Sequence, residues 1–106
     1  MSTVSRDRAE SPFILSLDIG TSSVRAAMFD RLGRAVEGLE ARERHEVRTT
    51  KEGASETDAD ALLERVWGCI DGVLDHAGYL KDQIRGIGIC TFVGNILGVD
   101  GDQRAV

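Results

Sequence analysis

The residues best suited to chemistry form one short segment near the N-terminus, Asp18-Ile-Gly-Thr-Ser-Ser-Val-Arg25. A carboxylate at the end of an apolar strand is costly unless its charge is compensated, and a hydrated Mg²⁺ would do so. Gly20 permits close backbone approach, the three hydroxyl residues after it can contact phosphate oxygens, and Arg25 can neutralise one of them. The segment therefore predicts a phosphate and magnesium site. The alternative is an ordinary hairpin turn in which Asp18 accepts hydrogen bonds from turn amides.

Two expected strands flank this segment. The apolar run at residues 13–17 continues into Asp18-Ile-Gly20, and its length and glycine stop favour a strand buried on both faces. After a turn at residues 20–23, a second strand at residues 24–29 is expected to return antiparallel to the first.

A third strand is expected from Arg34 onward. It follows Asp30-Arg-Leu-Gly33, which has the aspartate start and glycine end that a type I turn prefers. The apolar positions of the third strand change parity across Gly38, which predicts a β-bulge there. The charged residues 43–46 and the stretch 48–56, which has no apolar period, are expected to form a solvated strand edge and loop.

The clearest helical pattern begins after Thr57 or Asp58, either of which can cap it, and stops at Gly78. Gly68 and Gly72 lie one turn apart inside it, where each costs about 1 kcal/mol relative to alanine. A tight contact with the sheet would offset that cost, and exposed glycines are the alternative. The apolar residues that repeat with helical spacing are Leu62, Leu63, Val66, Trp67, Ile70, Val73, Leu74 and Ala77. Trp67 falls on this apolar face and is expected to be a core residue.

A last strand is expected over residues 84–91. Its isoleucines fall on one face, and Gly86, Gly88 and Cys90 leave the other face almost without bulk, which predicts a helix packed closely over this strand. The helical crossover makes it parallel to the first strand. Past it we expect a short apolar segment, a turn that begins at Asp100 and the start of another strand.

The order of elements is therefore β-β-β-α-β with a mixed sheet, an α/β arrangement that corresponds to half of a ribonuclease-H-like unit. The chain has 106 residues, which bounds it to one domain. Residues 1–11 contain three apolar positions and are expected to be a disordered, solvated tail, so that the domain spans residues 12–106.

The composition limits the classes of partner that this chain can bind. The formal net charge is −5 and apolar residues make up 42% of the chain, which is typical of a soluble globular domain with no electrostatic footprint for nucleic acids or anionic membranes. No segment suits a membrane helix and no apolar signal region is present, so we expect a cytoplasmic protein. Cys69 and Cys90 are interpreted as buried, reduced thiols, and neither His45 nor His76 has partners at metal-ligand spacing.

The pattern Asp18-Ile-Gly-Thr-Ser-Ser between two strands resembles the first phosphate-binding hairpin of the actin-like ATPase and sugar-kinase superfamily. Within that superfamily, residues 13–106 resemble the N-terminal part of the FGGY carbohydrate kinases, through this hairpin, the turn at residues 30–33 and Glu56-Thr-Asp58 before the helix. Two later segments are similar to the gluconate-kinase-like branch, namely Ile87-Gly-Ile-Cys-Thr-Phe92 and Leu97-Gly-Val-Asp-Gly101.

The resemblance implies ATP and Mg²⁺ as cofactors and a sugar or sugar acid as the small-molecule substrate. It implies that Asp18 helps to hold Mg²⁺ through water. Positioning and charge neutralisation do most of the rest in phosphoryl transfer. The residues implied to contact the ATP phosphates are Gly20, Thr21, Ser22, Ser23 and Arg25.

The same resemblance places Thr91 and Phe92 near the sugar pocket. Where the branch continues with Trp and His, this chain has a different sequence that ends in Asn95, which can hydrogen-bond a polyol; the identity of the sugar stays open. The aspartate that serves the family as general base would fall beyond Val106. We therefore expect no catalytic base within residues 1–106, and no sugar phosphorylation by this chain alone.

Two other functions fit parts of the pattern. A ribonuclease-H-like nuclease needs several carboxylates near Asp18, whereas the last strand ends in Cys90-Thr91. A non-catalytic actin-like nucleotide-binding or interaction module would share the hairpin but not the kinase-like segment from Thr91 to Asp100. An incomplete sheet also leaves an unpaired edge and an uncovered face, so we expect self-association.

Overall fold

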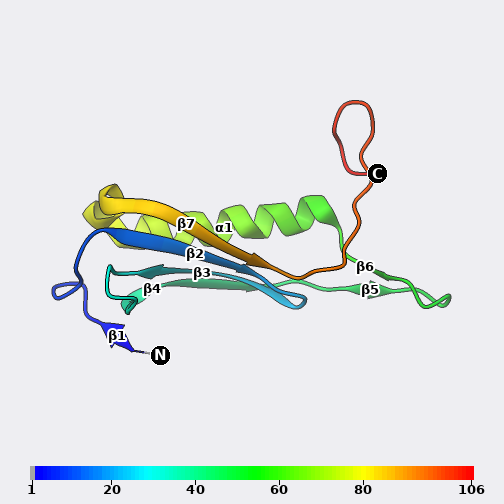
Figure 1. Cartoon of the computed structure of the whole chain (residues 1–106). Helices are drawn as coiled ribbons and strands as arrows, with labels where there is room; N and C mark the ends of the chain where they lie inside the picture. The colour runs from blue at the N-terminus through cyan, green and yellow to red at the C-terminus, as the bar shows by residue number, and fades with distance from the viewer. Residues whose placement is uncertain (1) are drawn as a thin grey trace.

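A five-stranded mixed sheet with one helix across one of its faces forms the body of the chain, and the computed structural model describes residues 2–106 (Figure 1). The molecule measures 52 × 30 × 20 Å, and the sheet order is β1-β4-β3-β2-β7. A short hairpin of β5 and β6 extends beyond one end of this sheet. The strands are β1 (Thr3–Val4), β2 (Phe13–Ile19), β3 (Ser23–Phe29), β4 (Ala35–Arg44), β5 (Arg48–Thr49), β6 (Ser55–Glu56) and β7 (Ile84–Thr91); the helices are α1 (Ala59–Ala77) and the 3₁₀ helix η1 (Gly78–Gln83).

The expected strand pairing is confirmed. Strand β3 runs antiparallel to β2 and to β4, and β7 runs parallel to β2 after the α1 crossover. The β3–β4 register shifts between Ala27 and Phe29, opposite the region of Gly38, whose φ of 77° is one that glycine adopts easily. The predicted bulge is therefore present. The turn at residues 30–33 is also present, closed by a hydrogen bond from Gly33 N to Asp30 O.

The helix has the predicted boundaries. Asp58 caps α1 by accepting hydrogen bonds from the amides of Asp60 and Ala61, and Gly78, with a φ of 57°, ends it. A Cβ at Gly68 would lie 3.4 Å from Glu43 Oε1, and one at Gly72 would lie 3.4 Å from Ala41 Cβ. The tight-contact alternative therefore suits Gly72, which is half-buried against Ala41, whereas Gly68 is exposed and faces the flexible side chain of Glu43, as the exposed-glycine alternative predicted.

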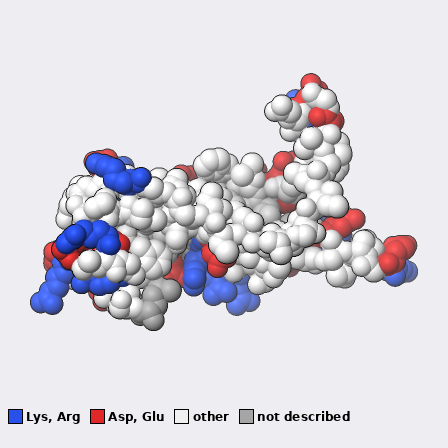
Figure 2. All heavy atoms as spheres, in the orientation of Figure 1, with Lys and Arg blue, Asp and Glu red and all other residues white. Residues whose placement is uncertain are grey.

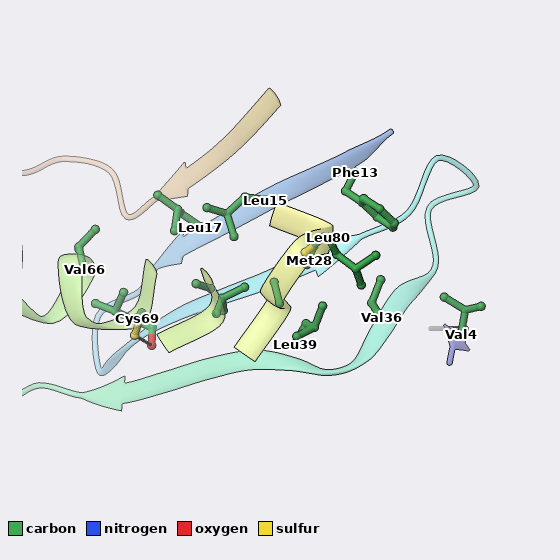
Figure 3. Packing of buried hydrophobic residues seen from close by; sticks show 14 residues of the cluster. Val4, Phe13, Leu15, Leu17, Met28, Val36, Leu39, Val66, Cys69 and Leu80 are labelled. Carbon is green, nitrogen blue, oxygen red and sulfur yellow. Dashed lines mark hydrogen bonds between the residues drawn. The ribbon is translucent and has the colours of Figure 1, made fainter. Parts of the chain in front are cut away.

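Buried apolar side chains fill the space between α1 and the sheet (Figure 3). Alternate residues of β2 point into this core, and the buried side of α1 meets them there. The largest fully buried side chains are those of Phe13, Met28, Leu39, Val24, Val73 and Cys69.

Three burial predictions were wrong, and one cause explains them. Helix α1 packs on β3 and β4, so β7 has no helix over it, and Ile89 is 64% exposed. Strand β2 is buried on one face only, and Ile14 on its other face is 40% exposed. Trp67 is 56% exposed on the side of α1 away from the sheet contact. A helix about 10 Å wide covers only about two strands spaced about 4.8 Å apart, so one helix cannot cover this sheet.

One cysteine is buried in the core and the other is exposed on the sheet. Cys69 is buried, its Sγ lies 3.5 Å from Val24 O, and burial raises the pKa of its thiol. Cys90 is exposed on the uncovered strand β7, which corrects the expectation that both thiols are buried.

The N-terminal segment differs from the expected solvated tail. Strand β1 pairs parallel with the edge of β4, and its Val4 is buried in the core. Further along, Glu10 donates its amide to Asp30 Oδ2, and its carboxylate pairs with the guanidinium groups of Arg31 and Arg34. One apolar side chain and a set of polar contacts are enough to dock a segment whose composition alone indicates solvation.

The residues after β7 form extended and turn structure away from the main sheet (Figure 1). Asp100 is a turn former, as predicted: its Oδ1 accepts the amides of Asp102 and Arg104. The expected further strand is reduced to one isolated bridge between Val99 and Ala105. Within residues 2–106, none of the helices combines the length and apolar character needed to cross a membrane.

Asp30→Ala should destabilise the domain by about 3 kcal/mol, because it removes a buried carboxylate and leaves its donors without partners. Asp30 Oδ2 lies 2.7 Å from Arg34 Nη2, and its Oδ1 accepts the amides of Leu32 and Arg34. The measurement is urea unfolding. Asp100→Ala is the matched control: it removes a similar turn carboxylate in an exposed position and should cost less than about 1 kcal/mol.

Lowering the pH should weaken the same interaction between Asp30 and Arg34. Hydrogen bonds from the Arg34 side chain, and then from backbone amides, hold the pKa of Asp30 well below its ordinary value despite its burial. Its stabilising effect is therefore complete above about pH 4 and is lost as the pH falls from there toward the folded-state pKa. Wild type should lose more unfolding free energy than Asp30→Ala between pH 5 and pH 3; equal losses would contradict this.

The free edge of β7 leads us to predict concentration-dependent self-association. Within the described chain, β7 pairs on one side only, and its Ile87 and Ile89 are exposed. Uncharged atoms dominate the middle of the face shown in Figure 2. Ile89→Lys should shift sedimentation toward monomer, whereas Leu32→Lys, at a similarly exposed leucine in the β3–β4 turn, should not. A monomeric wild type at high concentration would contradict the prediction.

Candidate phosphate-binding site

Two parallel strand ends bring the sequence-predicted site residues to one edge of the sheet. Because β2 and β7 are parallel, Asp18 pairs with Cys90, and Ile19 pairs with Thr91. The amide of Phe92 then donates to Ile19 O over 3.1 Å. The turn after β2 and the segment after β7 are therefore held side by side, as the carboxyl ends of parallel strands are in α/β sites.

A row of side chains crosses the open face of the sheet at this edge. Cys90, Asp18, Arg25 and Arg42 are successive partners on β7, β2, β3 and β4, and all four are exposed. They alternate with buried residues such as Leu17 that face α1, so the row lies on the face away from the helix. A carboxylate and two guanidinium groups thus lie together on an open surface next to the turn.

The ordinary-turn alternative for Asp18 does not describe its environment. Within residues 2–106, no group donates a hydrogen bond to its carboxylate, which is exposed beside Arg25. Arg25 lies 3.9 Å from Glu40, and both of these side chains are about half exposed. A pair that long and that solvated is weak, so Arg25 can turn to another anion at little cost.

The turn itself is tightly closed. Gly20 N donates to Ser23 O over 2.9 Å, and a Cβ on Gly20 would lie only 3.2 Å from that same oxygen. Thr21 and Ser22 at its tip are exposed. A side chain at position 20 would therefore crowd the backbone oxygen of Ser23, while the two tip residues are exposed to solvent.

Two further residues hold this turn and were not predicted from the sequence, Arg42 and His45. Arg42 Nε donates to Ser23 Oγ over 3.4 Å. His45, which was expected on a solvated edge, is only 7% exposed; its Nε2 lies 2.7 Å from Gly20 O, and its amide donates to Ser22 O over 3.0 Å. The length of the third strand could have indicated these contacts. An antiparallel third strand that is longer than the second extends past the end of the second strand and runs alongside the turn.

The expected sugar-side residues lie at the same edge. Thr91 is exposed at the end of β7, and Phe92 is half-buried, with its backbone amide bonded to Ile19 O at the end of β2. Asn95 donates its side-chain amide to Phe92 O over 3.1 Å, so this loop uses the amide for its own structure. The substrate roles of these three residues stay predictions.

The carboxylate of this site fits a hydrated magnesium ion. Mg²⁺ keeps several waters and is usually bound by one or two carboxylates together with phosphates of the substrate. The exposed carboxylate of Asp18 suits that arrangement and leaves room for hydration. Within the described residues 2–106, no three His, Cys, Asp or Glu side chains gather into a group that could hold a metal by protein ligands alone.

A cavity of about 710 Å³ lies beyond the turn, between the segment after β4 and the start of α1. His45 and Arg65 are among its lining residues, and each has one buried nitrogen without a hydrogen-bond partner within the described part of the chain, His45 Nδ1 and Arg65 Nε. Acidic side chains line the cavity too, among them Asp58 and Asp60, and Asp58 already caps the helix. The cavity is therefore mixed in charge.

Comparison with known proteins assigns a family to this arrangement. Residues 13–106 match the family model "FGGY family of carbohydrate kinases, N-terminal domain". The chain is 40% identical over 78 residues to glycerol kinase 2 of Streptomyces coelicolor and 43% identical over 77 residues to a glycerol kinase of Oceanobacillus iheyensis. These matches cover 74% and 73% of this chain but only 15% of each relative.

Solved structures agree on the fold. A xyloylose kinase from Brucella ovis superposes with a TM-score of 0.80 at 25% identity, over 88% of this chain and 19% of that one. Gluconate kinase from Lactobacillus acidophilus gives a TM-score of 0.77 at 20% identity, over 89% of this chain and 18% of that one. The expected ribonuclease-H-like fold class of actin-like ATPases and sugar kinases is confirmed.

Gly20→Ala should distort the turn and lower the free energy of unfolding by about 1 to 3 kcal/mol, because the new Cβ meets the backbone oxygen of Ser23. Gly88→Ala on β7 is the matched control, since a Cβ there has open space and alanine is less costly than glycine in a strand. Urea unfolding measures both variants. Equal stability of Gly20→Ala and wild type would show that the turn is not tightly closed.

Proposed function

Because the chain belongs to the FGGY family of carbohydrate kinases, we propose that it forms the phosphate-contacting part of an enzyme that transfers a phosphoryl group from ATP to a hydroxyl group of a sugar or sugar acid in the cytoplasm. The observation that carries the proposal is the meeting of the Asp18–Arg25 hairpin with Thr91 and Phe92 at one edge of the sheet. Nucleotide phosphates and acceptor must lie side by side for transfer, and this edge places both proposed contact regions together.

Arg25 is the proposed charge partner of the ATP phosphates. Within residues 2–106 its exposed guanidinium pairs only with Glu40, at 3.9 Å, and charge-assisted bonds from arginine to phosphate are among the stronger hydrogen bonds in proteins. Asp18 stands next to it and would bind water molecules of a magnesium ion carried by the nucleotide. That ion, when bound, neutralises charge that develops on the phosphates during transfer.

The acceptor is proposed to approach from the Thr91–Phe92 side. The relatives with clear sequence identity are named glycerol kinases, whereas the gluconate and xylulose kinases are related at lower identity. A small polyhydroxylated acceptor is common to all of them. The segments at residues 87–92 and 97–101 are similar to the gluconate-kinase-like branch and add a gluconate-like sugar acid to the candidates. Glycerol, xylulose and gluconate are therefore the three compounds to compare.

The nuclease alternative loses support from the site itself. Two-metal chemistry needs carboxylates that converge on the metals, and the two cross-strand neighbours of Asp18 are Arg25 and Cys90. An arginine beside the carboxylate suits a phosphate ligand better than a second metal ion.

Titration of the chain with Mg²⁺ and ATP, followed by amide NMR, should shift the signals of residues 18–25 with a dissociation constant of about 1 mM or weaker, because one hairpin offers few contacts. Arg25→Ala should weaken binding about tenfold, and Asp18→Asn should remove its dependence on Mg²⁺. Arg85→Ala and Asp75→Asn change exposed charges elsewhere and serve as controls. The proposal fails if about 10 mM nucleotide leaves the hairpin signals unmoved.

The same chain should not phosphorylate glycerol, xylulose or gluconate, because we propose that the general base lies outside residues 1–106. A coupled assay for ADP release tests this directly. Turnover above background that disappears in Asp18→Ala would contradict the proposed position of the base.

A further inference from the structure

We propose that His45 is a positioning residue for the turn at residues 20–23 and fixes the direction in which that turn presents its backbone amides. The inference rests on the proposed function only for the identity of the ligand. The contacts that support it are properties of the fold.

Two carbonyl groups of the turn bond to the same residue. Gly20 O lies 2.7 Å from His45 Nε2 and can only accept, so the imidazole carries its proton on Nε2 and donates it. Ser22 O accepts the backbone amide of His45 over 3.0 Å. The side chain and the main chain of His45 therefore hold alternate peptide units of the turn.

These two bonds dictate where the neighbouring N–H groups point. In a trans peptide the C=O of one residue and the N–H of the next lie in one plane and point in opposite directions. With Gly20 O and Ser22 O directed at His45, the N–H groups of Thr21 and Ser23 are directed away from it. The N–H groups of Thr21 and Ser23, which are two residues apart, therefore lie on the same side of the turn, where backbone N–H groups can donate to phosphate oxygens.

The burial of His45 indicates that its imidazole does more than pack against its neighbours. His45 is 7% exposed, and its Nδ1 is buried without a hydrogen-bond partner within residues 2–106. A buried polar atom without a partner is destabilising, so an apolar ring of similar size would suit packing better. What the imidazole adds at this position is the Nε2–H that Gly20 O requires.

The test compares His45→Gln with His45→Phe. The side-chain nitrogen of glutamine can reach the position of Nε2 and donate to Gly20 O, whereas phenylalanine keeps the ring and lacks the donor. We expect His45→Phe to speed hydrogen exchange of the Gly20 amide about tenfold and to weaken the Mg²⁺–ATP titration about tenfold, which corresponds to one lost hydrogen bond. His45→Gln should stay within about twofold of wild type in both measurements.

A merely structural role predicts the opposite order. Phenylalanine would then be the better replacement because it preserves packing, and any loss of binding would follow the loss of unfolding free energy measured in urea. His76→Phe is the control: it changes the other histidine, whose Nδ1 contacts Gly72 O on the exposed side of α1. If His45→Phe does not fold, His45→Asn replaces it, because the shorter amide does not reach Gly20 O.

The outcomes separate the two proposals. If Arg25→Ala weakens nucleotide binding and His45→Phe leaves both exchange and binding at wild-type values, the positioning role is wrong and the proposed function stands. If nucleotide moves no hairpin signal in any variant, the proposed function is wrong, and hydrogen exchange at Gly20 still decides whether His45 holds the turn.

Discussion

The central strand β2 is hydrogen-bonded on both sides, antiparallel to β3 and parallel to β7, and the site depends on these two registers. They place Asp18 between Arg25 and Cys90 and bring the turn after β2 against Phe92. A slip of one residue would send Asp18 into the core and Leu17 onto the open face. The apolar side chains that fix the register on the helix side therefore also fix which charged groups meet on the opposite side.

The sheet has one covered face and one open face because a single helix packs on it. Helix α1 makes its sheet contacts with β3 and β4, and Gly72 lies against Ala41 of β4. Strand β7 is held mainly by its pairing with β2, and most of its side chains are exposed. The edge that carries the proposed site is thus held mainly by backbone pairing, which makes the register of β7 more important than the identity of its side chains.

The features that sequence predicts well here are local. The hairpin, the Asp58 cap, the glycine stop and the bulge at Gly38 each depend on a few adjacent residues with known conformational preferences. Burial depends on what lies above each strand, and periodicity cannot state how many strands one helix covers; Trp67 has the spacing of a core residue and is exposed. Val4 and His45 were missed for the converse reason, because each lies in a polar stretch and is buried only by distant partners.

The site also shows how an acidic chain can suit a polyanion. The formal charge of −5 is spread over the molecule, whereas Arg25 and Arg42 stand together on the open face next to the turn. Both side chains are exposed, so added salt screens their attraction for phosphate over about 8 Å at physiological ionic strength. Backbone amides oriented from beneath by a buried residue depend less on salt, because their partner carbonyls are tied inside the fold. The arginines therefore attract a phosphate over a longer distance, whereas the backbone N–H groups fix the orientation in which it binds. His45 controls the second of these contributions.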